Sequence, residues 1–164
     1  MRARYGGKTD NPIGITGRDM SEQHTFFEAL EETLEQLKKT TWAEAKELEQ
    51  WFAESRKEIA ASLQRGEGFL SVGIRIRTET VLPTVAWRRF YMLNRGARPM
   101  ARDFRKPKGA WAYSTGDLQK NCHEAFHALI AETERRAQAI RQNVLLAHDL
   151  MRVLKTHSRR ITQN

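Results

Sequence analysis

Two long segments of the chain repeat apolar residues every three or four positions, the period of a helix that buries one side. In residues 21–65 the repeat runs through Phe27, Leu34, Ala45, Phe52 and Leu63, and Glu, Lys and Gln fill most of the other positions. The repeat keeps its phase from end to end. The pattern therefore predicts one long helix over residues 21–65, with an acidic outer face.

The second segment, residues 115–157, repeats apolar residues through Leu118, Phe126, Ala137, Ala147 and Leu154. A Ser-Thr pair at 114–115 precedes it and can cap a helix N-terminus. Each segment has about 40 residues and would span roughly 60 Å as a helix. Two matched apolar stripes predict an antiparallel pair of helices, and they leave open whether the partner helix belongs to the same chain or to a homodimer.

Between these segments, residues 68–113 show the patterns of β-structure. Apolar and polar residues alternate from Leu70 to Ile76, which is typical of a half-buried strand. Residues 84–93 predict a second strand rich in aromatics, residues 94–109 a basic loop, and residues 110–113 a short third strand. The predicted fold class is α+β, with two long antiparallel helices flanking a three-stranded antiparallel β-meander. Residues 21–157 would form a single α-βββ-α domain.

The two ends of the chain lack these patterns. Residues 1–20 contain four glycines and almost no aliphatic periodicity, which predicts a disordered tail, and residues 158–164 form a short basic tail. Met20 offers an alternative translation start. We find no apolar run of the roughly 18 residues that a membrane span needs, no secretory h-region, and only one cysteine, Cys122. These features predict a cytoplasmic protein that does not contact a membrane.

Positive charge gathers in the middle of the chain. The formal net charge is +8. Residues 66–113 hold ten Lys or Arg against three Asp or Glu, whereas residues 21–65 have a net charge of −4. A clustered basic segment indicates a polyanionic partner, and a merely solvated basic surface is the alternative. Basic side chains neutralise phosphates, and neighbouring aromatics can stack on unpaired bases.

Nine residues of this segment are the predicted nucleic-acid contacts: Arg75, Arg77, Arg88, Arg89, Arg98, Arg102, Arg105, Lys106 and Lys108. The neighbouring aromatics Trp87, Phe90 and Trp111 could instead belong to the core. Arg75 could pair with Glu67 or Glu79 rather than with a phosphate.

One motif of catalytic type occurs in the second helical segment. His123, Glu124 and His127 match H-E-x-x-H, in which two histidines one helical turn apart bind zinc and the glutamate serves as general base. Glu134 would lie about 10 Å beyond His127 on a continuous helix, too far to be the third ligand. Only a carboxylate of the first helix, such as Glu54 or Glu58, could complete the site. We therefore predict no metal, no other cofactor and no catalysis, and keep a zinc-dependent hydrolase as a minor alternative.

Residues 68–156 show a distinctive layout. A strand is followed by the run Trp87-Arg88-Arg89-Phe90, then by a basic loop leading to Trp111-Ala112-Tyr113-Ser114, and then by a helix that contains Glu132, Glu134 and Ile140-Arg141. In this layout the segment resembles the MobI family of auxiliary proteins for conjugative DNA transfer. The resemblance implies a cytoplasmic factor of a plasmid or integrative element that helps a relaxase act at the transfer origin without itself cutting DNA.

Our leading hypothesis is a DNA-binding accessory factor in which the β-region binds phosphates of the DNA backbone. The helices would dimerise or dock a protein partner, such as a relaxase or another transfer protein. The alternative is a protein–protein interaction module of a mobile element or phage, whose basic surface meets an acidic protein.

Overall fold

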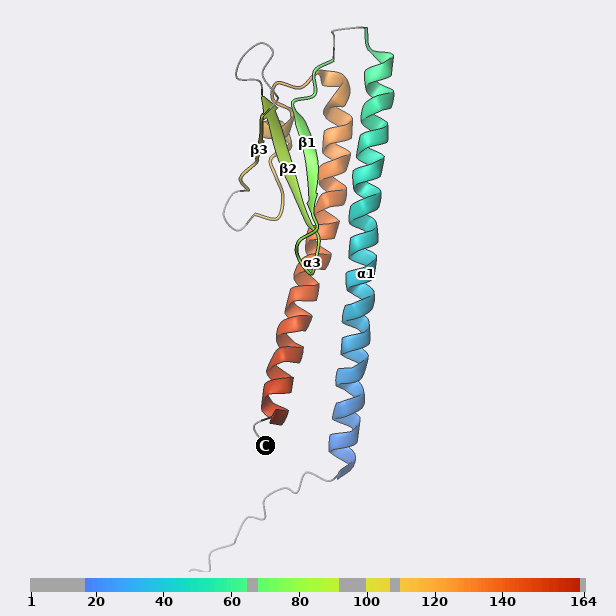
Figure 1. Ribbon diagram of the computed structural model, residues 1–164, viewed down its shortest axis with the longest axis vertical. Helices are drawn as coiled ribbons and strands as arrows, with labels where there is room; N and C mark the ends of the chain where they lie inside the picture. The colour runs from blue at the N-terminus through green and yellow to red at the C-terminus, as the bar shows by residue number, and fades with distance from the viewer. Residues whose placement is uncertain (1–16, 65–67, 92–99, 107–109, 163–164) are drawn as a thin grey trace, which may run out of the picture.

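The structure, a computed structural model, describes residues 17–64, 68–91, 100–106 and 110–162, with side chains described from residue 24 to residue 161. Two long helices, α1 (Gly17–Ser62) and α3 (His127–Thr162), run antiparallel and side by side (Figure 1). The strands β1 (Val72–Arg77), β2 (Thr84–Tyr91) and β3 (Met100–Asp103) form an antiparallel sheet in that order. The predicted α+β class with a three-stranded antiparallel sheet is confirmed.

The sheet covers only one half of the helix pair. It lies beside the C-terminal half of α1 and the N-terminal half of α3, and the other halves of the two helices continue without it (Figure 1). We call these bare halves, residues 24–40 of α1 and 144–161 of α3, the stalk. The sheet thus packs on one side of the helix pair, and "flanking" describes the order of the elements along the chain.

Alternation gives the sheet an inner face toward the helices and an outer face away from them. In β1, Val72, Ile74 and Ile76 pack into the core. Ile74 lies opposite Trp87 and Ile76 opposite Val85, so the second strand presents these two residues to the same side. Gly73 faces outward, where an added Cβ would come within 2.8 Å of the Phe90 ring. A residue with a side chain would therefore displace that ring.

The predicted apolar stripes form the core between the helices. Leu34, Ala45, Leu48 and Phe52 of α1 are buried, as are Leu129, Ala137, Ile140 and Ala147 of α3. Trp87 is fully buried, and its ring meets Phe52 edge-on at 5.8 Å between centroids. Helix α1 is unbroken as predicted, and the hydroxyl of its buried Thr41 donates to the Leu37 carbonyl.

The predicted third strand is wrong. Residues 110–113 form no strand, and β3 lies instead at Met100–Asp103, within the segment predicted to be loop. The backbone of the 110–113 segment bonds to side chains and not to a neighbouring strand. The Tyr113 amide donates to Glu134 (2.8 Å), and the Trp111 carbonyl accepts from Arg141 (2.9 Å). These bonds replace the strand ladder that the sequence pattern suggested.

The predicted continuous second helix is also wrong. A short helix α2 (Thr115–Gln119) is capped by Ser114 as expected, and a 3-10 turn η1 (Glu124–Phe126) follows before α3 begins. Asn121 has φ 65°, a left-handed conformation that ends a helix and that Asn tolerates well. Leu118 and Phe126 are nevertheless both buried. The apolar spacing therefore survives the break and conceals it in the sequence.

The ends of the long helices differ from the predicted limits. Helix α1 begins at Gly17, so the predicted tail is helical at residues 17–20, and residues 1–16 lie outside the described part. Helix α3 continues to Thr162, so most of the predicted basic tail forms its last turn. Within the described residues, neither helix has an apolar stretch long enough to cross a membrane.

Candidate nucleic-acid interface

The outer face of the sheet carries three of the predicted arginines, two of which share one carboxylate. Arg77 Nη2 lies 2.7 Å from Asp103 Oδ2, and Arg88 Nε lies 2.9 Å from Asp103 Oδ1. Hydrogen bonds from these two guanidinium groups, that of Arg77 first, lower the pKa of Asp103. Arg75 lies 4.0 Å from Glu79, the pairing that the sequence suggested. Asp103 thus holds two arginines side by side, and the five charged residues of this group, with Glu79 included, keep a net charge of +1.

The β2–β3 edge brings two more predicted arginines together on the inner side of the sheet. Arg89 lies directly opposite Arg102 in the register. The Arg89 guanidinium lies 4.5 Å above the Phe104 ring and donates to the Asp117 carbonyl (3.0 Å). A groove lined by Arg89, Tyr91, Arg102, Asp103 and Phe104 runs between them. Like charges opposed across two strands are destabilising, and an anion bound between them would relieve that repulsion.

The remaining predicted contacts lie beyond β3. Arg105 and Lys106 are exposed, and the Lys106 ammonium lies 5.9 Å from the Tyr113 ring centroid. Desolvation, followed by the nearby charge of Arg141, lowers the pKa of Lys106. Among the described residues, Arg102 and Arg105 have no carboxylate within ion-pair distance. Arg98 and Lys108 lie outside the described residues, so their predicted role stays a prediction.

The structure adds a basic row on α3 that the sequence analysis missed. Arg141 points from α3 into the sheet, where it bonds to Val85 and Trp111 carbonyls. Residues one and two heptads further along face the same side of the helix, below the sheet. The exposed side chains in this position are His148, Arg152, Lys155 and Arg159. Their spacing of four, three and four residues was the available signal. We call them the α3 row.

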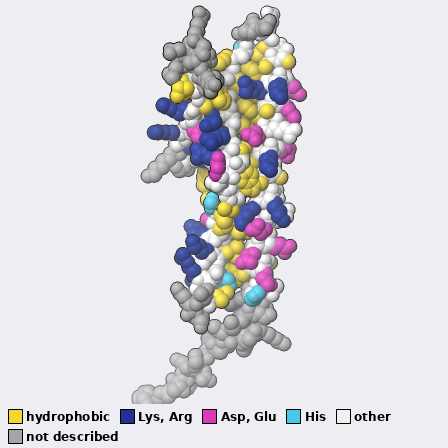
Figure 2. All heavy atoms as spheres, in the orientation of Figure 1, with side chains coloured by type: hydrophobic (Ala, Val, Ile, Leu, Met, Phe, Trp, Pro, Cys, Tyr) yellow, Lys and Arg dark blue, Asp and Glu magenta, His cyan; other side chains and the backbone are white. Residues whose placement is uncertain are grey.

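The sheet and the α3 row together form one elongated basic side of the molecule. Figure 2 shows Lys and Arg side chains over the sheet and again along the lower part of α3, whereas Asp and Glu side chains are more frequent along α1. Helix α3 carries seven Lys or Arg against three Asp or Glu, and the described side chains of α1 carry five against nine. The positive field is therefore concentrated on one side of the molecule.

A buried polar cluster positions this basic side on α3. Glu134 is fully buried and accepts hydrogen bonds from Trp87 Nε1 (2.7 Å), the Tyr113 amide (2.8 Å) and the Arg141 guanidinium. Desolvation lowers the pKa of Arg141, and the Glu134 charge opposes that effect. The cluster fastens β2 and the 110–113 segment to the same helix. It therefore fixes where the outer sheet face lies relative to the α3 row.

The aromatic residues of the basic segment differ in burial: one belongs to the core and others lie at the surface. Trp87 is core, as its alternative interpretation held, and Phe90 lies against Gly73 on the outer face. Trp111 is half exposed, at 51 %. Cys122 is partly buried, 3.3 Å from the Ser71 hydroxyl, and donates to the Leu118 carbonyl.

The H-E-x-x-H segment lacks the helical geometry that a zinc site needs. His123 is the extended N-cap of η1, and its Nδ1 accepts a hydrogen bond from the Ala125 amide. His127 begins α3 on the other side of this turn. The described parts of the chain contain no group of three His, Cys, Asp or Glu side chains placed to hold a metal ion. The expected position of this motif on an uninterrupted helix is wrong.

Comparison with known proteins gives one match. The sequence profile of a family described as "MobI protein" matches residues 37–155, which include most of α1, the whole sheet and most of α3. No curated protein and no solved structure matches the chain significantly. The profile covers well over half of the chain, including the buried cluster around Glu134. The chain therefore belongs to the MobI family, whose role in conjugation is that of a mobilisation accessory.

Proposed function

We propose that this protein binds DNA through its basic side and thereby assists a relaxase at a conjugative transfer origin. The observation that carries the proposal is the fixed cluster of arginines on the outer sheet face, continued by the α3 row. Arginine and lysine neutralise phosphates, and the resulting release of counterions supplies affinity that does not depend on sequence. An accessory factor of conjugation needs such affinity if it is to act on DNA.

The two parts of the surface suit different contacts. The outer face presents Arg75, Arg77 and Arg88, the last two held by Asp103, which suits phosphates along a duplex. The β2–β3 groove combines guanidinium groups with the rings of Tyr91 and Phe104, which suits an unpaired base and its phosphate. DNA at a transfer origin must be opened before transfer, so a factor with both surfaces could hold a duplex next to an exposed strand.

Binding to a mixed duplex across a salt series tests the proposal. We expect the affinity to fall steeply with salt, by a slope of about 0.9 in log–log form for each phosphate contacted. Replacing Arg75, Arg77 and Arg88 of the outer face with alanine should weaken binding and make the slope shallower.

The matched control removes three exposed lysines of the acidic helix, Lys39, Lys46 and Lys57. This variant loses the same formal charge from the opposite side, so it should bind nearly as tightly as the native protein. Equally weakened binding in both variants would mean that only net charge attracts DNA. Absence of binding at low salt would rule out the proposed function and favour a protein partner for the basic side.

A further inference from the structure

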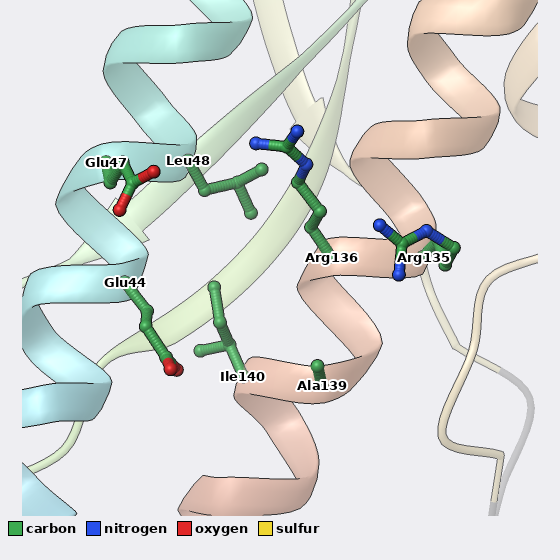
Figure 3. Close-up of a pocket in the computed structure, with 7 residues that line it drawn as sticks. All are labelled: Glu44, Glu47, Leu48, Arg135, Arg136, Ala139 and Ile140. Carbon is green, nitrogen blue, oxygen red and sulfur yellow. The ribbon is translucent and has the colours of Figure 1, made fainter.

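A second apolar line begins beside the sheet-bearing half and continues along the stalk, separate from the line that joins α1 to α3. On the side of the helix pair away from the sheet, Glu47 and Arg135 rim a groove that also contains Ala139 (Figure 3). On α3, Leu146 and Val153 follow Ala139 at intervals of seven residues and so lie on the same side of the helix. On α1, Thr40, Thr33 and Phe26 precede Glu47 at the same interval. We call this line the back seam.

Beyond its rim residues Glu47 and Arg135, the positions of the back seam are uncharged and largely exposed, and Glu32 lies beside them. Phe26, Leu146 and Val153 are exposed by 59 %, 52 % and 47 %. Ala139, Thr33 and Thr40 are small, exposed and uncharged. A second groove along α1, lined in part by Ala29, Thr33 and Thr40, follows the same line. In the close-up of the groove the strands lie behind the two helices, so the sheet does not cover this side there (Figure 3).

We propose that the back seam joins two copies of this chain into a parallel, two-fold symmetric dimer whose stalks form a four-helix bundle. Two helices leave one side of their apolar surface uncovered, and a second pair packed across it covers that surface in both copies. The basic sheets stay on the outside of the dimer, at the same end. The inference stands independently of DNA binding.

Charge selects the partner and its direction. A two-fold axis along the stalk places α1 of one copy opposite α3 of the other, whereas an axis across the stalk places α1 opposite α1. Beside the seam, α1 carries Glu32, Glu44 and Glu47, and α3 carries Arg135, Arg136 and Arg160. Only the parallel arrangement therefore opposes unlike helices. At the upper end of the seam it brings Glu47 toward the Arg135 region of the partner.

The first test measures the mass of the full chain in solution. A single chain has a mass of 19.0 kDa, so light scattering on a sizing column should give twice that value. Leu146→Glu with Val153→Glu should give the monomer. The dissociation constant should rise on the order of 100-fold or more, because each buried aliphatic side chain is removed twice in a symmetric interface.

Leu145→Glu is the matched control, because Leu145 adjoins Leu146 and is also exposed, at 40 %, but lies off the seam. This variant should remain dimeric. A monomeric native protein at high micromolar concentration would overturn the proposal. So would a dimer that Leu145→Glu dissociates and the seam variant does not. Thermal melts confirm that each variant is folded.

A charge exchange tests the direction of the dimer. Glu47→Arg should weaken the dimer by like-charge repulsion, and adding Arg135→Glu should restore it, because the parallel arrangement brings the two positions together. A control with Arg159→Glu in place of Arg135→Glu should give no restoration. A dimer that resists seam substitution, or whose affinity follows only the net charge, would overturn the parallel arrangement.

Discussion

The half of the molecule that carries the sheet, here called the upper half from its place in Figure 1, and the stalk use the same two helices in different ways. In the upper half the sheet covers one side of the helices, and Trp87, Phe126 and Ile130 are almost completely buried. In the stalk the buried residues are fewer and smaller, such as Leu34 and Ala147, and large apolar side chains remain exposed. The upper half completes its core within one chain. In the stalk, each helix buries mainly the side that faces the other helix.

The two halves also differ in how they treat charge. The upper half buries Glu134 with Arg141 inside a network of hydrogen bonds, whereas the stalk keeps its ion pairs, such as Arg152 with Asp149, on the surface. A buried pair is costly to disrupt, and an exposed pair contributes little. Stability should therefore depend on the buried cluster, and the stalk should respond mainly to what docks on it.

Replacing Glu134 with alanine should produce the largest effect. The change leaves Arg141 buried without its charge partner and removes the acceptor of Trp87 Nε1. We expect a decrease of about 3–5 kcal/mol in the free energy of unfolding, because a lone buried charge is strongly destabilising. Urea denaturation followed by circular dichroism measures this decrease.

Glu132→Ala is the control for that experiment. Glu132 lies on the same helix and binds two arginines, and hydrogen bonds from Arg135 and then Arg136 lower its pKa to about 2. Its pairs lie on the surface, so we expect little change in the unfolding curve. Equal destabilisation by the two substitutions would contradict the distinction between buried and exposed ion pairs. The double variant Glu134→Leu/Arg141→Met should recover much of the stability that Glu134→Ala removes.

The melting temperature should depend on protein concentration if the stalk is completed by a second chain. Association stabilises the folded state by mass action, so a hundredfold rise in concentration should raise the melting temperature measurably. The Leu146→Glu/Val153→Glu variant should melt at one temperature throughout that range. A native protein that melts independently of concentration would mean that the stalk is stable by itself.

Local patterns predicted most of the fold. Helical period and strand alternation are set by residues a few positions apart, and they located α1, β1, β2 and most of α3. The misplaced β3 has the sequence Met-Ala-Arg-Asp, which shows no alternation of apolar and polar residues. Its pairing with β2 fixes it, and no short-range pattern records that pairing.

The candidate interface was only partly predictable for a similar reason. Composition located the basic segment, but it could not divide the arginines between two faces of the sheet, because the division depends on register. The buried cluster was also missed, since Glu134 gathers donors from positions 7, 21 and 47 residues away. The α3 row was missed because its spacing in the sequence does not show which side of the molecule the row faces. That side follows from the contact of Arg141 with the sheet.

Removing charges from the α3 row tests whether the stalk shares the basic side of the upper half. Arg152, Lys155 and Arg159 lie on one face of α3 and are exposed. Alanine at all three should make the salt dependence of DNA binding shallower, by about 0.9 for each phosphate that the row neutralises in the native protein, and should leave the unfolding curve nearly unchanged. An unaltered slope would confine DNA binding to the sheet.

Asp103→Asn should have the smallest effect, in the opposite direction. The change removes the carboxylate that Arg77 and Arg88 share, which frees two guanidinium groups on the outer face, and DNA affinity should rise by a factor of a few at low salt. The same carboxylate contributes stability above its unfolded pKa of about 3.9 and loses that contribution as pH falls through its lower folded value. The native protein and the variant should therefore differ in unfolding free energy at neutral pH and converge in strong acid. Weaker DNA binding by Asp103→Asn would instead mean that the fixed spacing of the two arginines matters more than their charge, and filter binding at two salt concentrations distinguishes these outcomes.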